Sequence, residues 1–577
     1  MRIIYNSSQM KIRWLLRKKW EEEECLSLSQ KWKLSPLLVA LILNRGINKE
    51  DFEDYLFPSF DKLHDPFLMK GMEEVVERIL LSISRRERIL IYGDYDVDGI
   101  TATSLILKFM KDLKFPAYYY IPHRQTEGYG LNKEAIRKAS SKGINLIITC
   151  DCGTSSLEEI RFARSLGIDV IVTDHHQVSK KLPSDFLIIN PHNPECSYPF
   201  KELSGVGVAF KLCQAIASRV GFPEERLKTY LDLVAIGTLA DIVSLVGENR
   251  TLVKLGLEML PSATTCAGLR ALINVAGLSG RKIREREVGY ILAPRLNACG
   301  RLSLAKTAVK LLLSDSPGEA ALLARKLNRE NSRRQNLEKK MCEQAEEIIS
   351  GKIKQVLVVA KESWHPGVVG LVASYLKEKY HRPAIAFSIE KNIARGSARS
   401  IPNFSIFDAL LNCSDLLTSF GGHEMAAGMT LPADNIKKLE ERLNFIASRT
   451  LSSDDFTPCK FFDAEIDLRE INVELARQLQ ILSPFGPGNP KPVFLAKNVK
   501  VVDSRPLRRG KELVLSDFSK EKQFKAFWFD LTGDGRERKF LPGQVVDIFY
   551  FPSLDEWQKG EIRIEIKGAV PSTTFSQ

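Results

Sequence analysis

Three acidic residues alternate directly after an apolar run. Asp94, Asp96 and Asp98 follow the run Ile89-Leu-Ile-Tyr-Gly93, which is typical of a buried strand, and a helix is predicted from about Gly99 onwards. In α/β proteins, ligands bind at the carboxyl ends of the strands. Carboxylates crowded at such an end repel one another unless a cation holds them together. This segment therefore predicts metal ligands.

Further candidate ligands follow other apolar runs of the chain. Asp151 comes after one such run, and His175 and His176 come after another, whereas Asp241 is a candidate that does not follow a predicted strand. This set is rich in oxygen, carries imidazoles and lacks thiolates, so it suits Mn²⁺ or Mg²⁺ better than structural zinc. Carboxylates and imidazoles at several strand ends indicate a site for two metal ions. The alternative is a set of unrelated helix caps and solvated loops.

The bulk properties limit the class of protein. The 577 residues are too many for a single core and predict three or four domains, and the content of 44% hydrophobic and 27% charged residues is typical of soluble globular proteins. Neither a membrane-spanning apolar stretch nor a signal-peptide core is present. The ten cysteines are scattered and form no CxxC pair, which predicts that the protein works in the reducing cytoplasm. The net charge of +12 permits a polyanionic partner without proving one.

The pattern of apolar runs predicts the order of the domains. From about residue 75 to 260, short apolar runs alternate with helical stretches, which is typical of βαβ units and a parallel sheet. The predicted parts are an N-terminal extension with a helical pattern (1–70), a first α/β domain (71–260), a helical region that ends in a long connecting helix at 317–350 (261–352), a second α/β domain (353–452) and a small all-β barrel (453–577).

The motifs resemble those of a known family, the DHH phosphoesterases. Four segments carry the resemblance: Gly93-Asp-Tyr-Asp-Val-Asp-Gly99, Cys150-Asp-Cys-Gly153, Thr173-Asp-His-His176 and Gly237-Thr-Leu-Ala-Asp-Ile-Val243. A fifth, Gly421-Gly-His-Glu-Met-Ala-Ala-Gly428, is similar to the glycine-rich signature of the DHH-associated domain. Segments such as Leu203-Ser-Gly-Val-Gly207 and Pro484-Phe-Gly-Pro-Gly-Asn-Pro490 narrow the resemblance to the branch that degrades single-stranded DNA.

The resemblance implies a fold and an activity. The expected fold is α/β, with a parallel-sheet DHH domain and a DHH-associated domain joined by a long helix, followed by an OB-fold. The expected activity is that of a 5′→3′ exonuclease in DNA repair and recombination, which hydrolyses phosphodiester bonds of single-stranded DNA with two Mn²⁺ or Mg²⁺ ions and releases mononucleotides.

The resemblance also implies a role for each ligand. One ion would be held by Asp98, Asp151, His175 and Asp241. The second would be held by Asp94 or Asp96, with Asp151 bridging the two ions. His176 would face the scissile phosphate, and its alternative is a neutral group that fixes Asp174 or His175. Asp174 is expected to orient a histidine rather than to bind metal.

Other residues are candidates for contacts with DNA. Ser397 and Arg399 lie two apart on a predicted strand and so share a face, where a hydroxyl and a guanidinium suit phosphate oxygens. The further phosphate candidates are Gly421, Gly422 and His423, and those for a clamp on the 5′-phosphate are Arg124 and Arg301. In the barrel, Trp528 is a candidate for stacking on bases. Each arginine could instead be a surface residue, and the aromatic residues near Trp528 could be core.

Two other functions remain open at this stage. The first is a DHH-family phosphatase for short oligonucleotides or small nucleotides. The C-terminal barrel argues against it, because such relatives resemble the two catalytic domains alone. The second is a non-catalytic nucleic-acid-binding scaffold, which would have lost ligands that are all present here. The family role implies single-stranded DNA as the partner, together with a single-strand-binding protein and a helicase. Nothing in the sequence demands an oligomer or a membrane, so a cytoplasmic monomer is expected.

Overall fold

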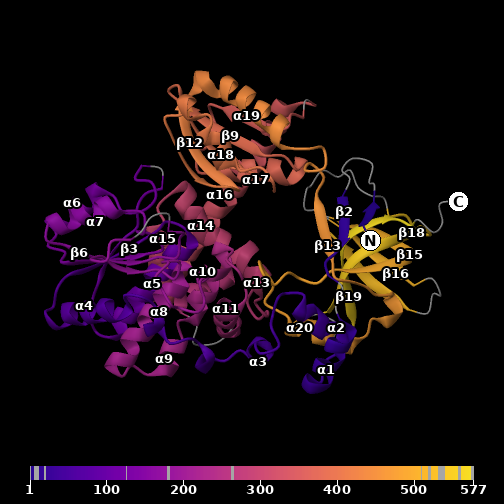
Figure 1. Ribbon diagram of the computed structural model, residues 1–577, viewed down its shortest axis with the longest axis horizontal. Helices are drawn as coiled ribbons and strands as arrows, with labels where there is room; N and C mark the ends of the chain where they lie inside the picture. The colour runs from indigo at the N-terminus through magenta and orange to yellow at the C-terminus, as the bar shows by residue number, and fades with distance from the viewer. Residues whose placement is uncertain are drawn as a thin grey trace. The chain divides into compact units, whose positions relative to one another are not determined.

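The computed structural model divides the chain into two compact units (Figure 1). The described residues are 2–5, 12–18, 21–124, 126–178, 182–260, 266–351, 353–507, 510–517, 522–529, 540–555 and 560–572. The parallel-sheet unit consists of Glu50–Gln335 and Pro484–Pro490. The sheet-and-barrel unit consists of Met1–Lys49, Asn336–Ser483 and Lys491–Gln577.

A five-stranded sheet forms the centre of the parallel-sheet unit. Its strands are β4 (Tyr118–Tyr120), β3 (Ile89–Gly93), β5 (Leu146–Cys150), β6 (Asp169–Thr173) and β7 (Leu187–Ile189), in that order. Every neighbouring pair is parallel. The predicted parallel sheet is therefore confirmed, and the carboxyl ends of all five strands meet at one edge.

Helices cover both faces of this sheet because successive side chains of its strands point to opposite sides. Ile91 packs into one core, and Leu90 and Tyr92 pack into the other. The first core is shared with α4 (Met72–Ser84), α5 (Val97–Asp112) and α8 (Gly205–Val220). The second is shared with α6 (Lys133–Ser141) and α7 (Leu157–Ser165). Figure 1 shows α6 and α7 on the side of the sheet opposite to α4, α5 and α8.

A helical region follows the sheet, as predicted. Its elements are α9 (Glu224–Lys228), α10 (Leu231–Asp241), α11 (Gly247–Met259), α12 (Ala267–Val275), α13 (Glu285–Glu287), a π-helix (Val288–Leu292), α14 (Ala293–Leu302) and α15 (Lys306–Leu313). The long helix α16 (Pro317–Ile349) comes next. Ser316 caps it, because its Oγ accepts a hydrogen bond from the Glu319 N–H at 3.4 Å. This helix runs from the parallel-sheet unit into the sheet-and-barrel unit.

The second sheet has five strands and is mixed. Its order is β11 (Ser419–His423), β12 (Ala426–Pro432), β10 (Ile393–Arg399), β9 (Ala384–Glu390) and β8 (Leu357–Lys361). Only the β8–β9 pair is parallel. The helices around it are α17 (Val369–Tyr380), α18 (Ile406–Leu411) and α19 (Ile436–Thr450). The predicted second α/β part is present.

The C-terminal part is a closed barrel, as predicted. Its strands are β15 (Phe494–Leu507), β16 (Gly510–Ser516), β17 (Gln523–Trp528), β19 (Ile562–Pro571) and β18 (Val545–Leu554), and β18 pairs back to β15. The short strand β14 (Ala464–Glu465) extends the sheet beside β15, and α20 (Val473–Ile481) precedes the barrel strands.

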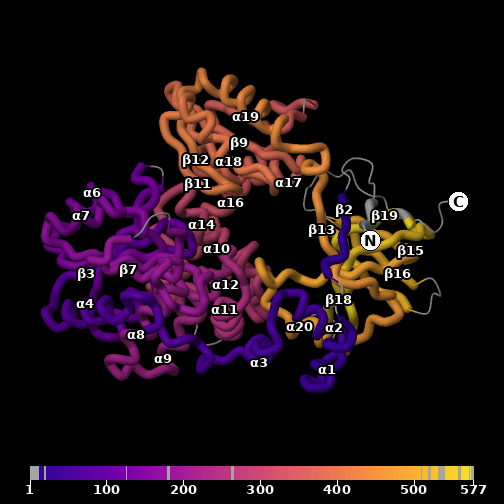
Figure 2. The backbone as a smooth tube through the Cα atoms, in the orientation of Figure 1, coloured from indigo at the N-terminus to yellow at the C-terminus, as the bar shows by residue number. Residues whose placement is uncertain are grey.

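The first residues of the chain differ from the sequence prediction. Residues 1–70 do contain helices, α1 (Glu22–Trp32), α2 (Pro36–Leu43) and α3 (Phe52–Leu56). However, β1 (Arg2–Tyr5) and β2 (Ile12–Leu16) are strands, and β2 pairs with β13 (Cys459–Phe462). Figure 2 shows this N-terminal strand beside β13. The helical prediction was wrong there because Trp14 stacks on Phe549, with ring centroids 3.7 Å apart, and local propensity could not reveal so distant a contact.

Part of the organisation remains a prediction. The structure does not test the domain boundaries at residues 70, 260, 352 and 452. Among the described residues, no helix combines the length and the apolar character that crossing a membrane requires.

Candidate metal centre

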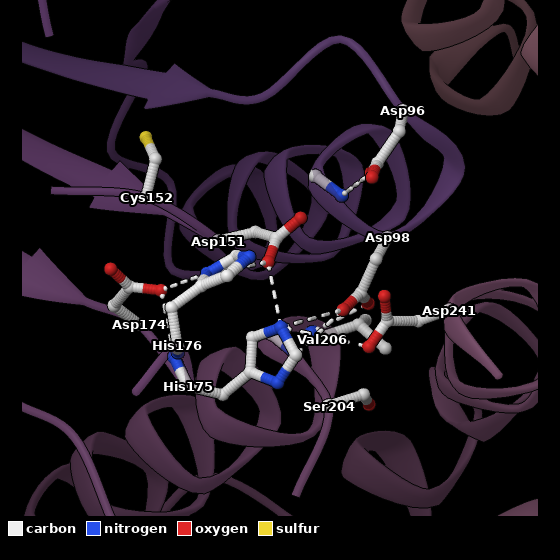
Figure 3. Close-up of polar contacts among 12 residues, drawn as sticks. Asp96, Asp98, Asp151, Cys152, Asp174, His175, His176, Ser204, Val206 and Asp241 are labelled. Atoms are coloured by element: carbon white, nitrogen blue, oxygen red, sulfur yellow. Dashed lines mark hydrogen bonds and ion pairs between the residues drawn. The ribbon is translucent and has the colours of Figure 1, made fainter. Parts of the chain in front are cut away.

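The candidate ligands gather at the carboxyl edge of the parallel sheet (Figure 3). Asp94, Asp151 and His175 directly follow or closely follow β3, β5 and β6, which are adjacent strands. Two further ligands come from helices. Asp98 lies in the first turn of α5, and Asp241 is the last residue of α10. Strand order and helix packing therefore bring together residues that are more than 100 positions apart in the chain.

Acidic and imidazole atoms form adjoining groups that could each hold a cation. One group is Asp98, His175 and Asp241, and another is Asp94, Asp96 and Asp151. A third group joins Asp151 to the two histidines. Within each group, the ligand atoms lie within 4.8 Å of one another. Asp151 belongs to two of these groups, so its carboxylate lies within reach of both.

His175 is at the centre of the arrangement. Its Nε2 lies 3.1 Å from Asp151 Oδ1, 3.6 Å from Asp241 Oδ2 and 3.9 Å from Asp98 Oδ2. Burial, together with the charge of His176, lowers the pKa of His175 to about 4. At neutral pH, His175 is therefore the neutral imidazole that metal binding requires.

Several buried polar atoms here lack hydrogen-bond partners. Among the described residues, Asp94 Oδ1, Asp151 Oδ1 and His175 Nε2 are buried without one. Unpaired buried polar atoms are costly and need an explanation. A cation held between these atoms would satisfy all three, so the donor set fits Mn²⁺ or Mg²⁺.

The charges of the carboxylates point to the same conclusion. Burial raises the pKa of Asp94, Asp98 and Asp151 well above the ordinary value, and neighbouring carboxylates raise it further. Burial and the charge of Asp96 raise the pKa of Asp241 to about 7. In addition, Asp241 ends a helix, where the macrodipole disfavours negative charge. A divalent cation would reverse these penalties and let the carboxylates ionise together.

Asp98 belongs to a candidate metal group and also binds the first turn of α8. Its side chain is fully buried, and its carboxylate accepts hydrogen bonds from the Gly205 N–H at 2.6 Å and the Val206 N–H at 2.9 Å. These N–H groups belong to the first turn of α8 and have no partner within that helix. Asp98 thus anchors the start of α8 to the metal centre.

Asp174 orients a histidine, in agreement with the sequence analysis. Its Oδ1 lies 2.7 Å from His176 Nδ1, and its Oδ2 accepts a hydrogen bond from the Thr154 N–H at 2.9 Å. Burial lowers the pKa of His176, but the bond to Asp174 and nearby carboxylates outweigh it and raise that pKa to about 9. His176 is therefore positively charged and could face a phosphate. The Tyr129 hydroxyl lies 3.0 Å from His176 Nδ1 and donates to the Asp151 carbonyl.

Glycines leave room for the carboxylates. A Cβ at Gly205 would lie 2.6 Å from Asp151 Oδ1, and one at Gly99 would lie 2.7 Å from the Asp94 Cβ. Likewise, a Cβ at Gly237 would lie 2.9 Å from Asp98 Oδ1. Real Cβ atoms do not approach other atoms so closely, and the positions of the ligands therefore depend on these three glycines.

The two arginine candidates lie near the candidate metal-binding loop, residues 94–96 between β3 and α5. The Arg124 guanidinium lies 4.9 Å from the centroid of the Tyr95 ring, and its charge lowers the pKa of Asp94 against the larger effect of burial. The charge of Arg301 likewise lowers the pKa of Tyr95, which burial raises. Arg124 and Gly300 line a small pocket together with Tyr95. The structure therefore places Arg124 against Tyr95, the residue after Asp94, and places Arg301 near enough for its charge to act on the same tyrosine.

The candidates on the second sheet form a group of their own. Arg399 Nη1 donates a hydrogen bond to Ser397 Oγ at 3.0 Å. Ser397 pairs across the sheet with Gly428, and Gly428 pairs with Gly421. Gly421 and Gly428 are exposed, and no atom of the described residues lies within 4 Å of their missing Cβ positions, so bare backbone extends beside Ser397.

The rest of the glycine-rich segment continues this exposed edge. Gly422 has a φ of 148° and its missing Cβ would clash with the backbone of Ala427, so only glycine fits there. His423 is exposed at the end of β11. A bare backbone beside a hydroxyl and a guanidinium is suited to an anionic group.

The barrel candidate lies on the core-facing side of its strand. Trp528 is half-buried and its ring packs edge-on against Phe540, 6.0 Å away. Phe527 points to the opposite side of β17, where the Arg563 guanidinium lies 3.9 Å from the centroid of its ring. The role of Trp528 stays a prediction. Phe527 is one of the neighbouring aromatic residues for which the sequence left a core position open, and its place on the outer side of the strand makes it a second candidate.

Two kinds of site residue were missed by the sequence analysis. Tyr129 carries no motif of its own, and only the fold shows its hydroxyl beside His176. Gly205 lies in a segment that supported the resemblance, and its close approach to Asp151 could not be read from spacing.

Three segments of the chain match known domain families. Residues 88–238 match the DHH family, N-terminal domain, residues 353–448 match the DHHA1 domain, and residues 462–568 match the RecJ OB domain. These matches follow the order of the parallel sheet, the second sheet and the barrel.

Similar proteins and structures bear the name RecJ. The chain is 42% identical to the single-stranded-DNA-specific exonuclease RecJ of Bacillus subtilis, over 97% of this chain and 71% of that protein. It is 36% identical to the Escherichia coli protein of the same name, over 80% and 83% of the two chains. A crystal structure of RecJ from Thermus thermophilus in complex with Mn²⁺ matches with a TM-score of 0.83 and 28% identity, covering 97% of this chain and 79% of that one.

Proposed function

Because this chain belongs to the RecJ family of single-stranded-DNA-specific exonucleases, we propose that its metal centre removes mononucleotides from the 5′ end of single-stranded DNA. The chain is a metal-dependent exonuclease that acts on single-stranded DNA, with Mn²⁺ or Mg²⁺ as the metal. The direction of digestion, the mononucleotide product and the roles of individual residues are the parts that we propose.

One observation supports the use of two ions. Asp151 forms one group with His175 and His176 and another with Asp94 and Asp96, and its Oδ1 has no hydrogen-bond partner among the described residues. We assign one ion to Asp98, Asp151, His175 and Asp241. We assign the other to Asp94, Asp96 and Asp151. When bound, such ions promote attack by water on a phosphodiester and neutralise the charge that develops there.

His176 is proposed to hold the scissile phosphate. Its ring is fixed by Asp174 and carries a positive charge, because its pKa is raised to about 9. A fixed cation aimed at the phosphate stabilises the charge of the transition state without reorganisation. Tyr129 keeps the ring in this orientation through its contact with Nδ1.

The 5′ end of the strand is proposed to bind through its phosphate. Arg124 and Arg301 lie near the candidate metal-binding loop, where a guanidinium can hold phosphate oxygens. On the second sheet, Ser397 and Arg399 are proposed to contact the same strand, beside the exposed backbone of Gly421. His423 and Gly422 continue this surface.

Phe527 and Trp528 give opposite expectations for binding by the barrel. Phe527→Ala is expected to weaken binding of a single-stranded oligonucleotide by roughly 1–3 kcal/mol, the cost of losing one stacked base, with little change in melting temperature. Trp528→Ala is expected to lower the melting temperature instead, because its ring packs on Phe540. Fluorescence anisotropy would measure oligonucleotide binding by both variants, and thermal unfolding would measure their melting temperatures. Weaker binding by Trp528→Ala at an unchanged melting temperature would restore Trp528 as the stacking residue.

The decisive test of the function is product analysis. A long single strand with a 5′-phosphate, labelled at either end, would be digested with Mn²⁺ beside a duplex of the same sequence. We expect mononucleotides from the 5′ end and an intact duplex. Cleavage of only very short oligonucleotides would instead indicate a phosphatase for small substrates, and DNA binding without any cleavage would indicate a scaffold.

Further parts of the sequence prediction extend this proposal. We infer that the enzyme acts as a monomer in the cytoplasm, in DNA repair and recombination. A single-strand-binding protein and a helicase are the inferred partners that provide its single-stranded substrate.

A further inference from the structure

A loop between α20 and the barrel strands belongs to the parallel-sheet unit. This loop, Pro484–Pro490, is grouped with that unit, although the chain on both sides of it belongs to the sheet-and-barrel unit. We call it the 484–490 loop. The loop is docked on the 242–246 turn, which directly follows the candidate metal ligand Asp241. We propose that the 484–490 loop positions Asp241 for metal binding, and this inference rests on the proposed metal centre.

Asp241 depends on its surroundings more than the ligands on strand ends do. It is the last residue of α10, and the chain reverses into α11 through the 242–246 turn. The first residue of the turn, Ile242, adopts a left-handed conformation with a φ of 64° and is 70% exposed. A β-branched residue rarely adopts this conformation. The turn is therefore strained, and something outside it must hold it in place.

The 484–490 loop makes direct contacts with this turn. The Leu245 N–H donates a hydrogen bond to the Pro487 carbonyl at 2.8 Å. A Cβ at Gly486 would lie 2.6 Å from Leu245 Cδ1, and Gly488 has a φ of 72° with its missing Cβ directed at Ser244 and Val246. Larger residues would not fit at either glycine, so the loop backbone lies against the turn.

Asn489 makes the loop rigid and ties it to Tyr55. Its Nδ2 donates a hydrogen bond to the Pro484 carbonyl at 2.7 Å, and its backbone pairs with Gly486 in both directions. Its Oδ1 accepts a hydrogen bond from the Tyr55 hydroxyl at 3.1 Å. Asn489 is fully buried. This closed loop is a preformed surface rather than a flexible linker.

Tyr55 links the loop to the start of α11, and so to the far side of the turn. The buried guanidinium of Arg250 lies 4.0 Å from the centroid of the Tyr55 ring and donates a hydrogen bond to the Tyr55 carbonyl. Asn249, next to it, donates a hydrogen bond from Nδ2 to the Ser244 carbonyl at 3.0 Å. The turn after Asp241 is thus held from the loop side and from the helix side.

The consequence is a dependence of metal affinity on residues outside the set of candidate metal ligands. Tyr55 and the loop act as positioning residues, because they fix the turn that aims Asp241 at His175. Partners of metal ligands outside the ligand set change metal affinity by about 10- to 100-fold when mutated. The site to which Asp241 contributes should weaken when the loop is displaced, and the other site should change less.

The test measures Mn²⁺ binding to the full chain in the absence of DNA, by calorimetry and by electron paramagnetic resonance of free Mn²⁺. Tyr55→Phe keeps the ring over Arg250 and removes only the hydroxyl. We expect it to weaken one class of Mn²⁺ site by up to about 5-fold, the factor that one ordinary hydrogen bond is worth. Gly488→Val displaces the loop from Ser244, and we expect a weakening of at least about 10-fold.

A matched control separates positioning from general loss of stability. Tyr550→Phe removes another buried hydroxyl, which donates to the Ile466 carbonyl at 3.0 Å inside the barrel region, and is expected to leave Mn²⁺ affinity unchanged. In Tyr55→Phe, nuclease activity should fall at limiting Mn²⁺ and recover at saturating Mn²⁺, so that the Mn²⁺ concentration for half-activity changes and kcat does not.

Two results would overturn the proposal. The first is wild-type Mn²⁺ affinity in both Tyr55→Phe and Gly488→Val. If Gly488→Val does not fold, wild-type affinity in Tyr55→Phe alone would have the same consequence. The second is an equal loss of affinity in Tyr550→Phe. These results are independent of the exonuclease assay. Suppose that the Mn²⁺ affinity of the chain depends on this loop but the wild type leaves single-stranded DNA intact. That result would contradict the proposed function and not this inference.

Discussion

Asp151→Asn is expected to reduce exonuclease activity by more than about 10³-fold and to leave the fold intact. Loss of a single group that stabilises a transition state costs about 10²–10³-fold, and Asp151 belongs to two of the three candidate metal groups. Asparagine has the same shape and tolerates the left-handed conformation of this position, where φ is 63°. The substitution therefore removes the charge and not the backbone geometry.

The stability of the same variant gives an independent readout. Burial and the surrounding carboxylates raise the pKa of Asp151 well above its ordinary value, so the folded protein without metal disfavours its ionised form. At neutral pH, the neutral amide avoids this penalty. In the presence of a chelator, Asp151→Asn should melt at the same temperature as the wild type or higher, whereas added Mn²⁺ should stabilise the wild type more than the variant.

The matched control for Asp151→Asn is an exposed aspartate in the same unit. Asp185 forms an ion pair with Arg164 at 2.7 Å and is mostly exposed, so Asp185→Asn is expected to retain wild-type activity. The measurements are kcat on a 5′-phosphorylated single strand and Mn²⁺ binding by calorimetry. Activity of Asp151→Asn within tenfold of the wild type would mean that the metal centre lies elsewhere.

The sequence allowed the candidate ligands to be placed at one edge of the sheet because strand ends are easy to locate. The apolar runs before Asp94, Asp151 and His175 are short and continuous, and parallel strands bring their carboxyl ends to one edge. Asp241 is different, since it ends a helix and was the one candidate ligand that did not follow a predicted strand. Its position depends on the 242–246 turn and on a loop that lies more than 240 residues farther along the chain.

Other features depend on contacts that no local pattern encodes. The strand Ile12–Leu16 forms because it pairs with β13 and its Trp14 ring stacks on Phe549. Both partners are more than 400 residues away in the sequence. In β17, aromatic residues occupy both faces, so the alternation of the strand could not tell which face was core. The packing of Trp528 on Phe540 decides that question.

Gly205→Ala is expected to reduce exonuclease activity roughly 10²-fold, the cost of about 1 Å of misplacement in an active site. Gly205 is the first residue of α8, where alanine would normally favour the helix. Here its Cβ would lie 2.6 Å from Asp151 Oδ1 and 2.7 Å from the Asp151 Cβ. The atoms in the way are a buried carboxylate and its Cβ, so either Asp151 or the start of α8 must shift, and Asp98 is bonded to that same turn.

Gly318→Ala provides the comparison that isolates this steric effect. Gly318 also lies in the first turn of a helix, and the nearest atom to its missing Cβ, Ser316 Oγ, is 3.9 Å away. We expect Gly318→Ala to match the wild type in kcat and Mn²⁺ affinity, while Gly205→Ala loses both and remains folded by circular dichroism. Equal activity of the two variants would show that Asp151 can move without loss of function, which would contradict a role for its exact position between the two metal groups.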